Sequence, residues 1–514
     1  MPRLERRPLV PSGAVPRQSA RRAHRSWPQR LLLATNVLLV IACLGAAASL
    51  SKLRSTIEDV PVVDIGSSLT PTPEVTEPRN FLIIGTDSAA RLDEGDSVAN
   101  GRENLGKLAD VIMILRVDPR DGSAKLLSIP RDTRVEVAPN WGMSRINSAI
   151  AGVDGPQNLV RTIKRNFGIS IDNYVEIDFR SFRDLVEVLG GVPVYFAVPV
   201  RDENTGLHVP EAGCVMLDPV QALAYARARH FEYKQDGKWR ADGTGDLGRI
   251  TRQQDFIKRS LRRASDKGIR NPSTAVGIVN AAASSVRMDD TLDVGTILTL
   301  VSEFQNFNPD SLLSLQVPTY PDARGGVAYQ SVDWTAAEPI LEQFRGVDPG
   351  ASPEPTAIIV DVVGPDADAE ALGETAAQLD EAGFDAEVFE ARRSASTTIS
   401  YGPSGREAAL RLAAQLGAVP QFRLDPDITG YRVVLAVGSD FGGVLADAVP
   451  IESLPQDRIP PPSTASTTTT EPPSTETVAP GDTVAPGDVA DPSVTTTTAP
   501  GVVPTDPERA ATCR

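Results

Sequence analysis

The longest apolar run of the chain, LLLATNVLLVIACLGAAASL, occupies residues 31–50 and contains no charged residue. A helix of this length crosses about 30 Å of hydrocarbon. Residues 1–30 carry eight arginines against one glutamate, so the positive-inside rule predicts a cytoplasmic basic segment followed by an extracytoplasmic remainder. A cleaved signal peptide and a buried core helix are the alternatives, but the run is longer than a usual signal sequence. We therefore expect a single-pass signal-anchor in the cell membrane.

Shorter apolar runs alternate with helical periodicity from residue 80 to residue 346, which predicts one α/β domain. The turn sequence DPRDG at 118–122 makes the second and third expected strands a hairpin. The expected strands are FLIIG (ending at Gly85), 111–117, 124–130, 174–178 and 192–196. The expected helices are 155–167, 179–189, 246–267, 272–287 and 290–305.

A second, smaller α/β unit is expected at residues 356–440, after a linker at 346–355. Residues 51–79, before the first domain, are also expected to be a linker, because the stretch from residue 55 is too polar to pack. Residues 455–514 are rich in Pro, Thr and Ser and repeat TVAPGD in tandem, so we expect a disordered tail that no folded core needs. Within the second unit, strands are expected at 357–363, 386–391 and 431–437, and helices at 367–382 and 404–416.

Charge and composition exclude several classes of protein. The chain of 514 residues has a net charge of −16 despite its basic N-terminus, and an acidic body argues against nucleic acid as a partner. Three cysteines and three histidines leave little room for a Cys-rich or His-rich metal cluster. A disulfide between Cys214 and Cys513 is left open, because nothing in the sequence fixes its geometry. The P-loop, HExxH, CxxC and GxSxG motifs are all missing from the sequence.

Carboxylates and an arginine gather at one expected edge of the sheet. Asp87 follows the first strand and Asp110 precedes the second, so antiparallel pairing would bring both to the same edge. Pairing outward from the hairpin turn sets Asp110 opposite Pro130 or Arg131, and Asp132 follows directly. Two carboxylates beside an arginine suit Mg²⁺ bound to a phosphate ligand, with Asp87 and Asp110 as the metal ligands. The alternative is structural, because strand ends are often rich in aspartate and the arginine then merely pairs with it.

A second basic cluster reads YARARH at 225–230 and is followed by DLGRITRQQ at 246–254. The spacing of two puts Arg227 and Arg229 on one face of an extended segment, whereas in a helix they would diverge by about 200°. In a helix Arg249 and Gln253 are four residues apart and share a face. The planar fork of arginine suits phosphate, so the cluster indicates an anion site, although an ordinary solvated face accounts for such runs equally well.

Seven blocks, in their order along the chain, resemble the LytR-CpsA-Psr family of cell-wall phosphotransferases. The blocks are GTDS…R (85–91), ADVIMIL (109–115), SIPRD (128–132), RINSA (145–149), LGGVPV (189–194), ALAYARARH (222–230) and DLGRITRQQ (246–254). They cover residues 80–346, and residues 356–440 resemble the accessory C-terminal domain of the family. The stretch 88–109 is longer than the family's usual one, and Arg145 stands where the family often has lysine. The resemblance implies an α/β/α domain with a central mixed sheet.

The same resemblance implies a membrane-anchored transferase of phosphorus-containing groups that depends on Mg²⁺, or on Mn²⁺ in its place. It would move a glycopolymer, such as teichoic acid or arabinogalactan, from a polyprenyl-pyrophosphate carrier to peptidoglycan as a phosphodiester. The prenyl tail would lie along the apolar faces of the helices at 155–189 and 272–305. A lipid-pyrophosphate hydrolase and a non-catalytic binder or regulator of wall polymer remain the other classes. The sequence does not identify the polymer, the acceptor hydroxyl or the general base.

The family's functional residues match particular positions of this chain. Its metal ligands match Asp87 and Asp110, and the residues expected to be catalytic are Asp110, Arg131 and Asp132. Its pyrophosphate contacts match Arg131, Arg227, Arg229, Arg249 and Gln253.

Overall fold

The computed structural model describes residues 62–70, 77–87, 108–268, 286–292, 296, 299–300, 307–346, 353–392, 394–455 and 513. The expected cytoplasmic segment 1–30 and anchor 31–50 lie outside these residues, as does almost all of the tail. Within the described part of the chain, no helix has both the length and the apolar character that a membrane crossing requires.

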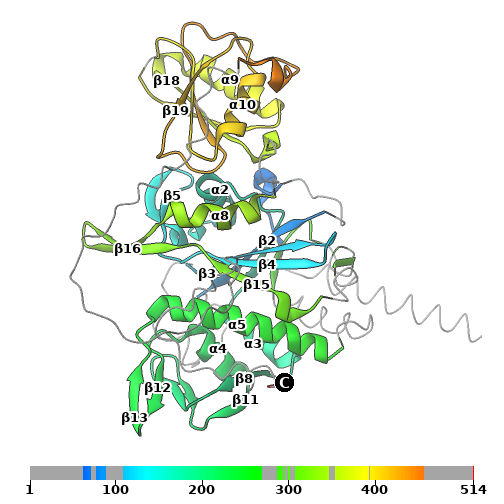
Figure 1. The fold of residues 1–514 in the computed structure, drawn as a ribbon, viewed down its shortest axis with the longest axis vertical. Coiled ribbons are helices and arrows are strands. Elements are labelled where there is room, and N and C mark those ends of the chain that lie inside the picture. The colour runs from blue at the N-terminus through cyan, green and yellow to red at the C-terminus, as the bar shows by residue number, and fades with distance from the viewer. Residues whose placement is uncertain are drawn as a thin grey trace, which may run out of the picture. The chain divides into compact units, whose positions relative to one another are not determined.

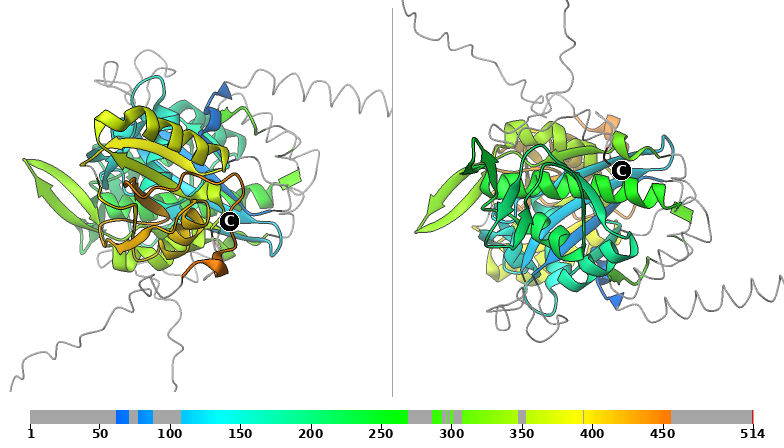
Figure 2. Two further views of the ribbon diagram at one scale, coloured as in Figure 1. Left: turned by 90° about the horizontal axis from the view of Figure 1, so that it is seen from above. Right: turned by 90° about the horizontal axis from the view of Figure 1, so that it is seen from below.

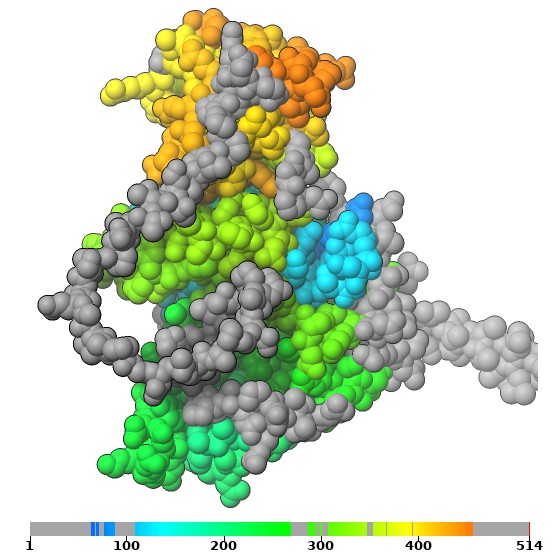
Figure 3. Space-filling model, viewed as in Figure 1, coloured from blue at the N-terminus to red at the C-terminus, as the bar shows by residue number. Residues whose placement is uncertain are grey.

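A seven-stranded mixed sheet forms the centre of the first domain (Figure 1), with the strand order β1-β14-β7-β2-β3-β4-β15. The strands are β1 (Val62–Val63), β2 (Arg79–Thr86), β3 (Ala109–Asp118), β4 (Ser123–Ser128), β7 (Asn173–Ile177), β14 (Arg287–Asp289) and β15 (Leu313–Gln316). The strands β2, β3 and β4 are antiparallel, as expected, while β7 and β15 pair in parallel with β2 and β4. The tip of the β3–β4 hairpin is exposed on the surface seen in Figure 3.

Helices cover both faces of this sheet, which gives the expected mixed α/β architecture with a central sheet. On one face lie α2 (Gly155–Phe167) and α8 (Trp334–Arg345); on the other lie α3 (Phe179–Val188), α4 (Pro219–Arg227) and α5 (Gly245–Asp266) (Figure 1). The helix α5 crosses the strands of the sheet, as the view from below shows (Figure 2).

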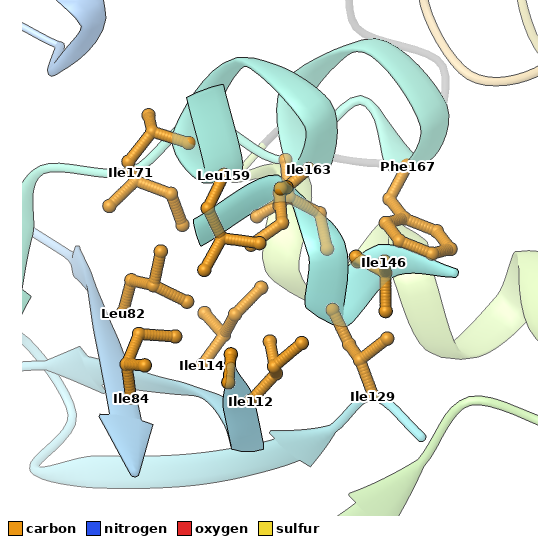
Figure 4. Packing of buried hydrophobic residues seen from close by; sticks show 14 of the residues in the cluster. Leu82, Ile84, Ile112, Ile114, Ile129, Ile146, Leu159, Ile163, Phe167 and Ile171 are labelled. Carbon is orange, nitrogen blue, oxygen red and sulfur yellow. The ribbon is translucent and has the colours of Figure 1, made fainter. Parts of the chain in front are cut away.

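Alternation along the central strands explains why both faces are buried. Leu82 and Ile84 of β2 point to the same face and pack toward Leu159 and Ile163 of α2 (Figure 4). The residues that alternate with them belong to the other face, where Phe81 is part of a second buried cluster and Ile83 packs against it. Strands covered on both sides therefore read as the nearly continuous apolar runs seen in the sequence.

Two expectations about this domain are wrong. Residues 62–69 are not a polar linker: β1 pairs in parallel with β14, and Val63 and Ile65 are buried in the sheet's core. The expected helix 272–287 ends instead in a strand, because Arg287–Asp289 pairs with β7 and Met288 is buried. Residues 272–285 of that helix, and most of the helix expected at 290–305, lie outside the described residues.

Smaller sheets flank the central one. The strands β9 (Val200–Asp202), β10 (Leu207–Val209), β12 (Glu232–Gln235) and β13 (Lys238–Ala241) form a four-stranded sheet in the order β10-β9-β12-β13. Three antiparallel pairs complete the domain: β5 (Arg134–Val137) with β6 (Gly142–Arg145), β8 (Val192–Phe196) with β11 (Gly213–Leu217), and β16 (Thr319–Arg324) with β17 (Val327–Val332).

A disulfide, which the sequence left open, joins Cys214 of β11 to Cys513. The two Cα atoms are 5.4 Å apart, within the range that a disulfide spans. Cys513 is buried, so this residue of the tail packs against the first domain. The expectation that no folded core needs the tail is therefore wrong at this residue.

The C-terminal unit is a five-stranded sheet in the order β19-β18-β22-β20-β21 with two helices. Its elements are β18 (Ile359–Gly364), α9 (Ala369–Glu381), β19 (Asp385–Glu390), β20 (Thr398–Tyr401), α10 (Arg406–Ala414), β21 (Gln421–Leu424) and β22 (Arg432–Ala436). The five expected elements are present, and the short strands β20 and β21 were not expected. The buried side chain of Arg165 in α2 donates to both carboxylate oxygens of Asp361 in β18, at 2.7 and 3.0 Å.

Candidate functional site

A β-bulge places Asp110 at the edge of the central sheet. Gly85 pairs with Val111 and Thr86 pairs with Ala109, so Asp110 is an extra residue with no partner on β2. A bulge of this kind bends a strand and redirects one side chain, and bulges are common beside active sites. The strand β3 begins at Ala109, two residues earlier than expected, and Asp110 therefore lies inside the strand and not before it.

Arg131 lies beside Asp110, as the hairpin pairing predicted. The ladder ends at the pair of Met113 with Ser128, and the N–H of Ile129 then donates to the backbone oxygen of Ile112 at 2.9 Å. Counting outward in the same register sets Asp110 opposite Arg131. The guanidinium of Arg131 donates a hydrogen bond from Nη1 to Oδ1 of Asp110, and about a fifth of each side chain is exposed. The prediction that these two residues meet is confirmed.

Two further arginines reach Asp110: Arg229 from the segment after α4, and Arg249 from α5. Arg229 Nη2 lies 3.8 Å from Oδ1 of Asp110, and Arg249 Nη2 donates to the backbone oxygen of Asp110 at 3.2 Å. Both arginines also contact Asp246, at 3.2 Å from Arg229 and 2.7 Å from Arg249. Three arginines and two aspartates thus form one charged cluster, with an excess of positive charge that an anion can neutralise.

The question of whether the YARARH segment is extended or helical has a mixed answer. The helix α4 ends at Arg227, and Ala228 is extended. Arg227 therefore lies on the last turn of the helix, with its guanidinium 4.7 Å from the ring centre of Phe179, while Arg229 lies beyond the helix and faces Asp246. The change of conformation at Ala228 separates the roles of the two arginines.

The charged cluster borders a narrow apolar cavity of about 150 Å³ between the sheet and the helices α3, α4 and α5. Its polar border includes Thr86, Asp110, Asp178, Arg227, Arg249 and Gln253. Its apolar lining includes Ile83, Val111, Met113, Ile177, Phe179, Phe182, Leu223, Phe256 and Ile257. Gln253 donates its side-chain N–H to the backbone oxygen of Ala226 at 2.9 Å, which holds the end of α4 against α5. The arrangement suits an amphiphile with an anionic head and an apolar tail.

The charges in the cluster perturb one another's protonation. Burial works to raise the pKa of Asp110, but the charge and hydrogen bond of Arg131, with the charges of Arg249 and Arg229, outweigh it and hold the pKa below its ordinary value. Burial lowers the pKa of Arg249 to about 10, against the opposing charge of Asp246. Asp110 is therefore ionised at neutral pH and available as an anionic ligand.

Thr86 and Asp87, at the end of β2 beside the bulge that carries Asp110, offer the hard oxygen donors that Mg²⁺ prefers. The hydroxyl of Thr86 is buried, lines the apolar cavity's border and has no hydrogen-bond partner among the described residues. Asp87 follows Thr86 directly, and its carboxylate accepts a hydrogen bond from the backbone N–H of Leu108 at 3.4 Å. Mg²⁺ takes one or two carboxylates together with phosphate oxygens and water, so this donor set is compatible with it. No group of three or more His, Cys, Asp or Glu residues is present within the described ranges.

Asp132 lies beside the cluster and faces a different neighbour. Its carboxylate is 3.4 Å from Nε of Arg145 and 3.7 Å from Nε of Arg131. Arg145 in turn donates to the backbone oxygen of Ala328 at 2.8 and 3.0 Å, which links this loop to the β16–β17 hairpin. A catalytic role of Asp132 stays a prediction.

Sequence reasoning missed two residues of the site. Asp246 bridges Arg229 and Arg249, and the signal was present, because an aspartate three residues before an arginine in a helix shares its face. Thr86 was missed because a buried hydroxyl without a partner leaves no trace in a single sequence. The sequence pointed to Asp87 and Asp110 because both are carboxylates at expected strand ends, a signal that a threonine does not give.

Comparison with known proteins identifies the class to which this fold and site belong. The profile of the LytR_cpsA_psr family matches residues 44–346, more than half of the chain, so the protein belongs to this family. Residues 357–441 match a second profile, described as LytR cell envelope-related transcriptional attenuator.

Individual relatives share part of the chain. It is 33% identical over 253 residues to the probable cell wall biosynthesis protein LcpB of Corynebacterium glutamicum, covering 48% of this chain and 54% of that protein. It is 29% identical over 258 residues to the polyisoprenyl-teichoic acid–peptidoglycan teichoic acid transferase TagU of Oceanobacillus iheyensis, covering 49% and 71%. The chain thus spans about half the length of the first of these relatives. A LytR-Csp2A-Psr enzyme from Actinomyces oris, of known structure, is 24% identical with a TM-score of 0.44, covering 56% of this chain and 97% of that one.

Proposed function

We propose that this protein transfers a glycopolymer, as a phosphodiester, from a polyprenyl-pyrophosphate carrier to peptidoglycan. One observation carries the proposal: an apolar cavity opens onto a cluster of arginines. A carrier lipid has an apolar tail joined to a pyrophosphate, and both parts find complementary surroundings at this place. The printed name of the Oceanobacillus relative, a polyisoprenyl-teichoic acid–peptidoglycan transferase, supports the same reaction class.

In this proposal the arginines bind the pyrophosphate and neutralise its charge. Phosphoryl transfer depends chiefly on positioning and on stabilising charge over the phosphate oxygens, so no special nucleophile is needed. Arg131, Arg229 and Arg249 supply planar donors to those oxygens. The acceptor hydroxyl forms the new P–O bond as the bond to the prenyl phosphate breaks, and the prenyl phosphate leaves with the displaced electron pair. The proton of the hydroxyl passes to a base.

Mg²⁺ is part of the proposal as the resident metal. Asp110, with Asp87 and the hydroxyl of Thr86, would hold it, and the metal would supply charge neutralisation at the pyrophosphate. A carboxylate must be deprotonated to bind Mg²⁺, and the lowered pKa of Asp110 keeps this ligand ionised.

We also propose that residues 31–50 anchor the chain in the cell membrane with the folded domains outside. The supporting observation is the uncharged run of twenty residues behind an arginine-rich segment. A carrier lipid stays in its bilayer, so an enzyme anchored in the same membrane encounters it by diffusion along that membrane. The tether would hold the apolar cavity within reach of that surface.

The experiment that tests the function follows the fate of the saccharide. The full chain, in detergent micelles, is supplied with Mg²⁺, a polyprenyl-pyrophosphate saccharide and peptidoglycan oligomers, and the products are read by mass spectrometry. We expect a saccharide joined to the acceptor through a phosphodiester, and loss of that product with EDTA. Free saccharide phosphate, formed equally with and without acceptor, would show a hydrolase instead. Carrier binding without any turnover would show a non-catalytic protein.

A further inference from the structure

The four-stranded sheet β10-β9-β12-β13 has one buried face and one polar face. Val200, Leu207 and Val209 point to the buried face and pack in the cluster beneath the sheet. In the antiparallel register, Arg201 pairs with His208 on one side and with Glu232 on the other, so these side chains share the opposite face. Lys234, two residues after Glu232 in β12, pairs with Trp239 of β13, and both continue the same face.

This polar face lies over a cleft of about 740 Å³, well within the 300–1,000 Å³ typical of small-molecule sites. Its lining includes Arg201, His230 and Glu232 from the small sheet and its approach, and Arg229 and Asp246 from the charged cluster. The cleft and the apolar cavity share no lining residue among those described. The ion pairs of Arg229 with Asp110 and of Asp246 with Arg249 join the two linings.

The sheet also fixes the position of Arg229. The carboxylate of Asp202 in β9 is fully buried and accepts hydrogen bonds from the backbone N–H groups of Arg229 and His230, each at 2.9 Å. A ligand on the polar face would therefore be held in fixed register with the arginines that face the pyrophosphate.

The chemistry of the lining points to a saccharide. Arg201 is balanced by Glu203 at 2.8 Å and Glu232 at 2.7 Å, so the cleft presents donors and acceptors side by side without a large excess of either charge. Sugar hydroxyls both donate and accept hydrogen bonds, and this lining can satisfy both. The guanidinium of Arg201 also lies 4.5 Å from the ring centre of Trp239, which does not line the cleft but supports the arginine from β13.

We propose that this cleft is the subsite for the acceptor glycan, which rests on the transfer reaction proposed above. An in-line displacement needs the attacking and leaving oxygens on opposite sides of the phosphorus. The apolar cavity takes the leaving prenyl phosphate, and the cleft beyond Arg229 and Asp246 is separate from it. The acceptor hydroxyl would enter from the cleft, with Arg201 and Glu232 holding the sugar rings.

The test measures binding of each substrate separately, with the full chain in detergent micelles. Arg201→Ala and Glu232→Ala, which change two residues of the lining, are compared with Arg240→Ala, a matched control in β13 whose half-exposed arginine pairs with Asp236 and does not line the cleft. The probes are peptidoglycan glycan tetrasaccharides for the acceptor and a polyprenyl-pyrophosphate disaccharide for the carrier, both followed by calorimetry. We expect the first two variants to weaken tetrasaccharide binding by about tenfold or more, with carrier binding within twofold of wild type. The control should match wild type for both.

Each other outcome overturns the inference in a distinct way. Unchanged tetrasaccharide binding in both variants, or an equal loss in Arg240→Ala, removes the subsite. Weakened carrier binding with unchanged tetrasaccharide binding would assign the cleft to the donor saccharide. Because these are binding measurements, they remain informative if the wild-type chain transfers nothing: that result would overturn the proposed function, and an Arg201-dependent tetrasaccharide affinity would still stand.

Discussion

Replacing Asp110 by asparagine tests the charged cluster at its centre. The substitution keeps the size and one oxygen of the side chain but removes the negative charge that Arg131, Arg229 and Arg249 share. Without ligand, the carboxylates that remain beside the three arginines are Asp246 and, 3.7 Å from Arg131, Asp132. The structure must tolerate their repulsion, and the proposed Mg²⁺ site loses an ionised ligand.

The size of both effects follows from the geometry. A hydrogen bond between charged groups contributes about 1.5–3 kcal/mol, and one-fifth exposure of both partners places Asp110 near the middle of that range, at about 2 kcal/mol. For a domain of this size, we expect the melting temperature to fall by about 4–8 °C. Loss of a metal ligand costs several kcal/mol in the transition state, so turnover should fall by about 10²–10⁴-fold.

The assay pairs thermal unfolding with transfer at increasing Mg²⁺, and Asp118→Asn is the matched control. Asp118 ends the same strand, and its partner Arg120 is mostly exposed, so this pair should contribute no more than about 1 kcal/mol. The low pKa of Asp110 adds a pH signature. A carboxyl whose pKa is depressed stabilises the fold above its unfolded pKa of about 4 and loses that contribution as the pH falls below it. The Asn variant should therefore lose less stability than wild type between pH 4 and pH 2.

Two results would refute the reasoning. If Asp110→Asn has the same melting temperature as Asp118→Asn and transfers polymer at the wild-type rate, the cluster has neither a structural nor a chemical role. If it melts several degrees earlier but transfers normally, Asp110 only holds the edge of the sheet, and the metal must be bound elsewhere.

The remaining predictions concern single residues. Arg131→Ala should leave Mg²⁺ binding in place and lower turnover by about 10³-fold, and Arg131→Lys should restore only part, because an ammonium lacks the planar fork; steady-state kinetics at saturating carrier measure both. Cys214→Ser should lower stability by about 2–4 kcal/mol in calorimetry, and a Cys43→Ser variant that keeps Cys214 and Cys513 should show no free thiol when denatured. Burial raises the pKa of Asp172 to about 6, against a hydrogen bond from the backbone of Asn80, so wild-type stability should fall by up to about 3 kcal/mol as the pH rises from 4 to 6. Asp172→Asn should flatten that slope in urea unfolding at each pH, and an unchanged slope would show that another group titrates.

The sequence predicts the central hairpin and the meeting of Arg131 with Asp110 correctly, because both depend on the local pattern of residues. Two apolar runs around a DPRDG turn define β3 and β4, and counting outward from the turn is enough to bring Arg131 to Asp110. The helix Gly155–Phe167 has the expected bounds for a similar reason, since Gly168 ends it in a left-handed conformation. The residues that define such elements lie within the elements or directly beside them.

What the sequence could not predict depends on partners distant in the chain. The short strand Val62–Val63 exists only because Arg287–Asp289 offers an edge more than two hundred residues later. Two residues of apolar character give no periodicity to read, so the segment looked like a linker. The end of the helix in the YARARH segment was ambiguous because the arginine spacing does not show that Tyr225 and Ala226 are buried, or that the ring of Tyr225 packs against Phe196 and Phe231.

The bulge at Asp110 has a consequence for how distant sequences are aligned and edited. Side chains on a strand alternate between faces, so removing one residue between Leu108 and Val111 would restore a regular ladder and leave the downstream core untouched. The aspartate could survive such a deletion and the motif would still be readable, yet the carboxylate would project from the opposite side of the strand. Whether a homologue keeps the extra residue opposite Gly85 and Thr86 therefore says more about the competence of its site than the presence of an acidic residue does.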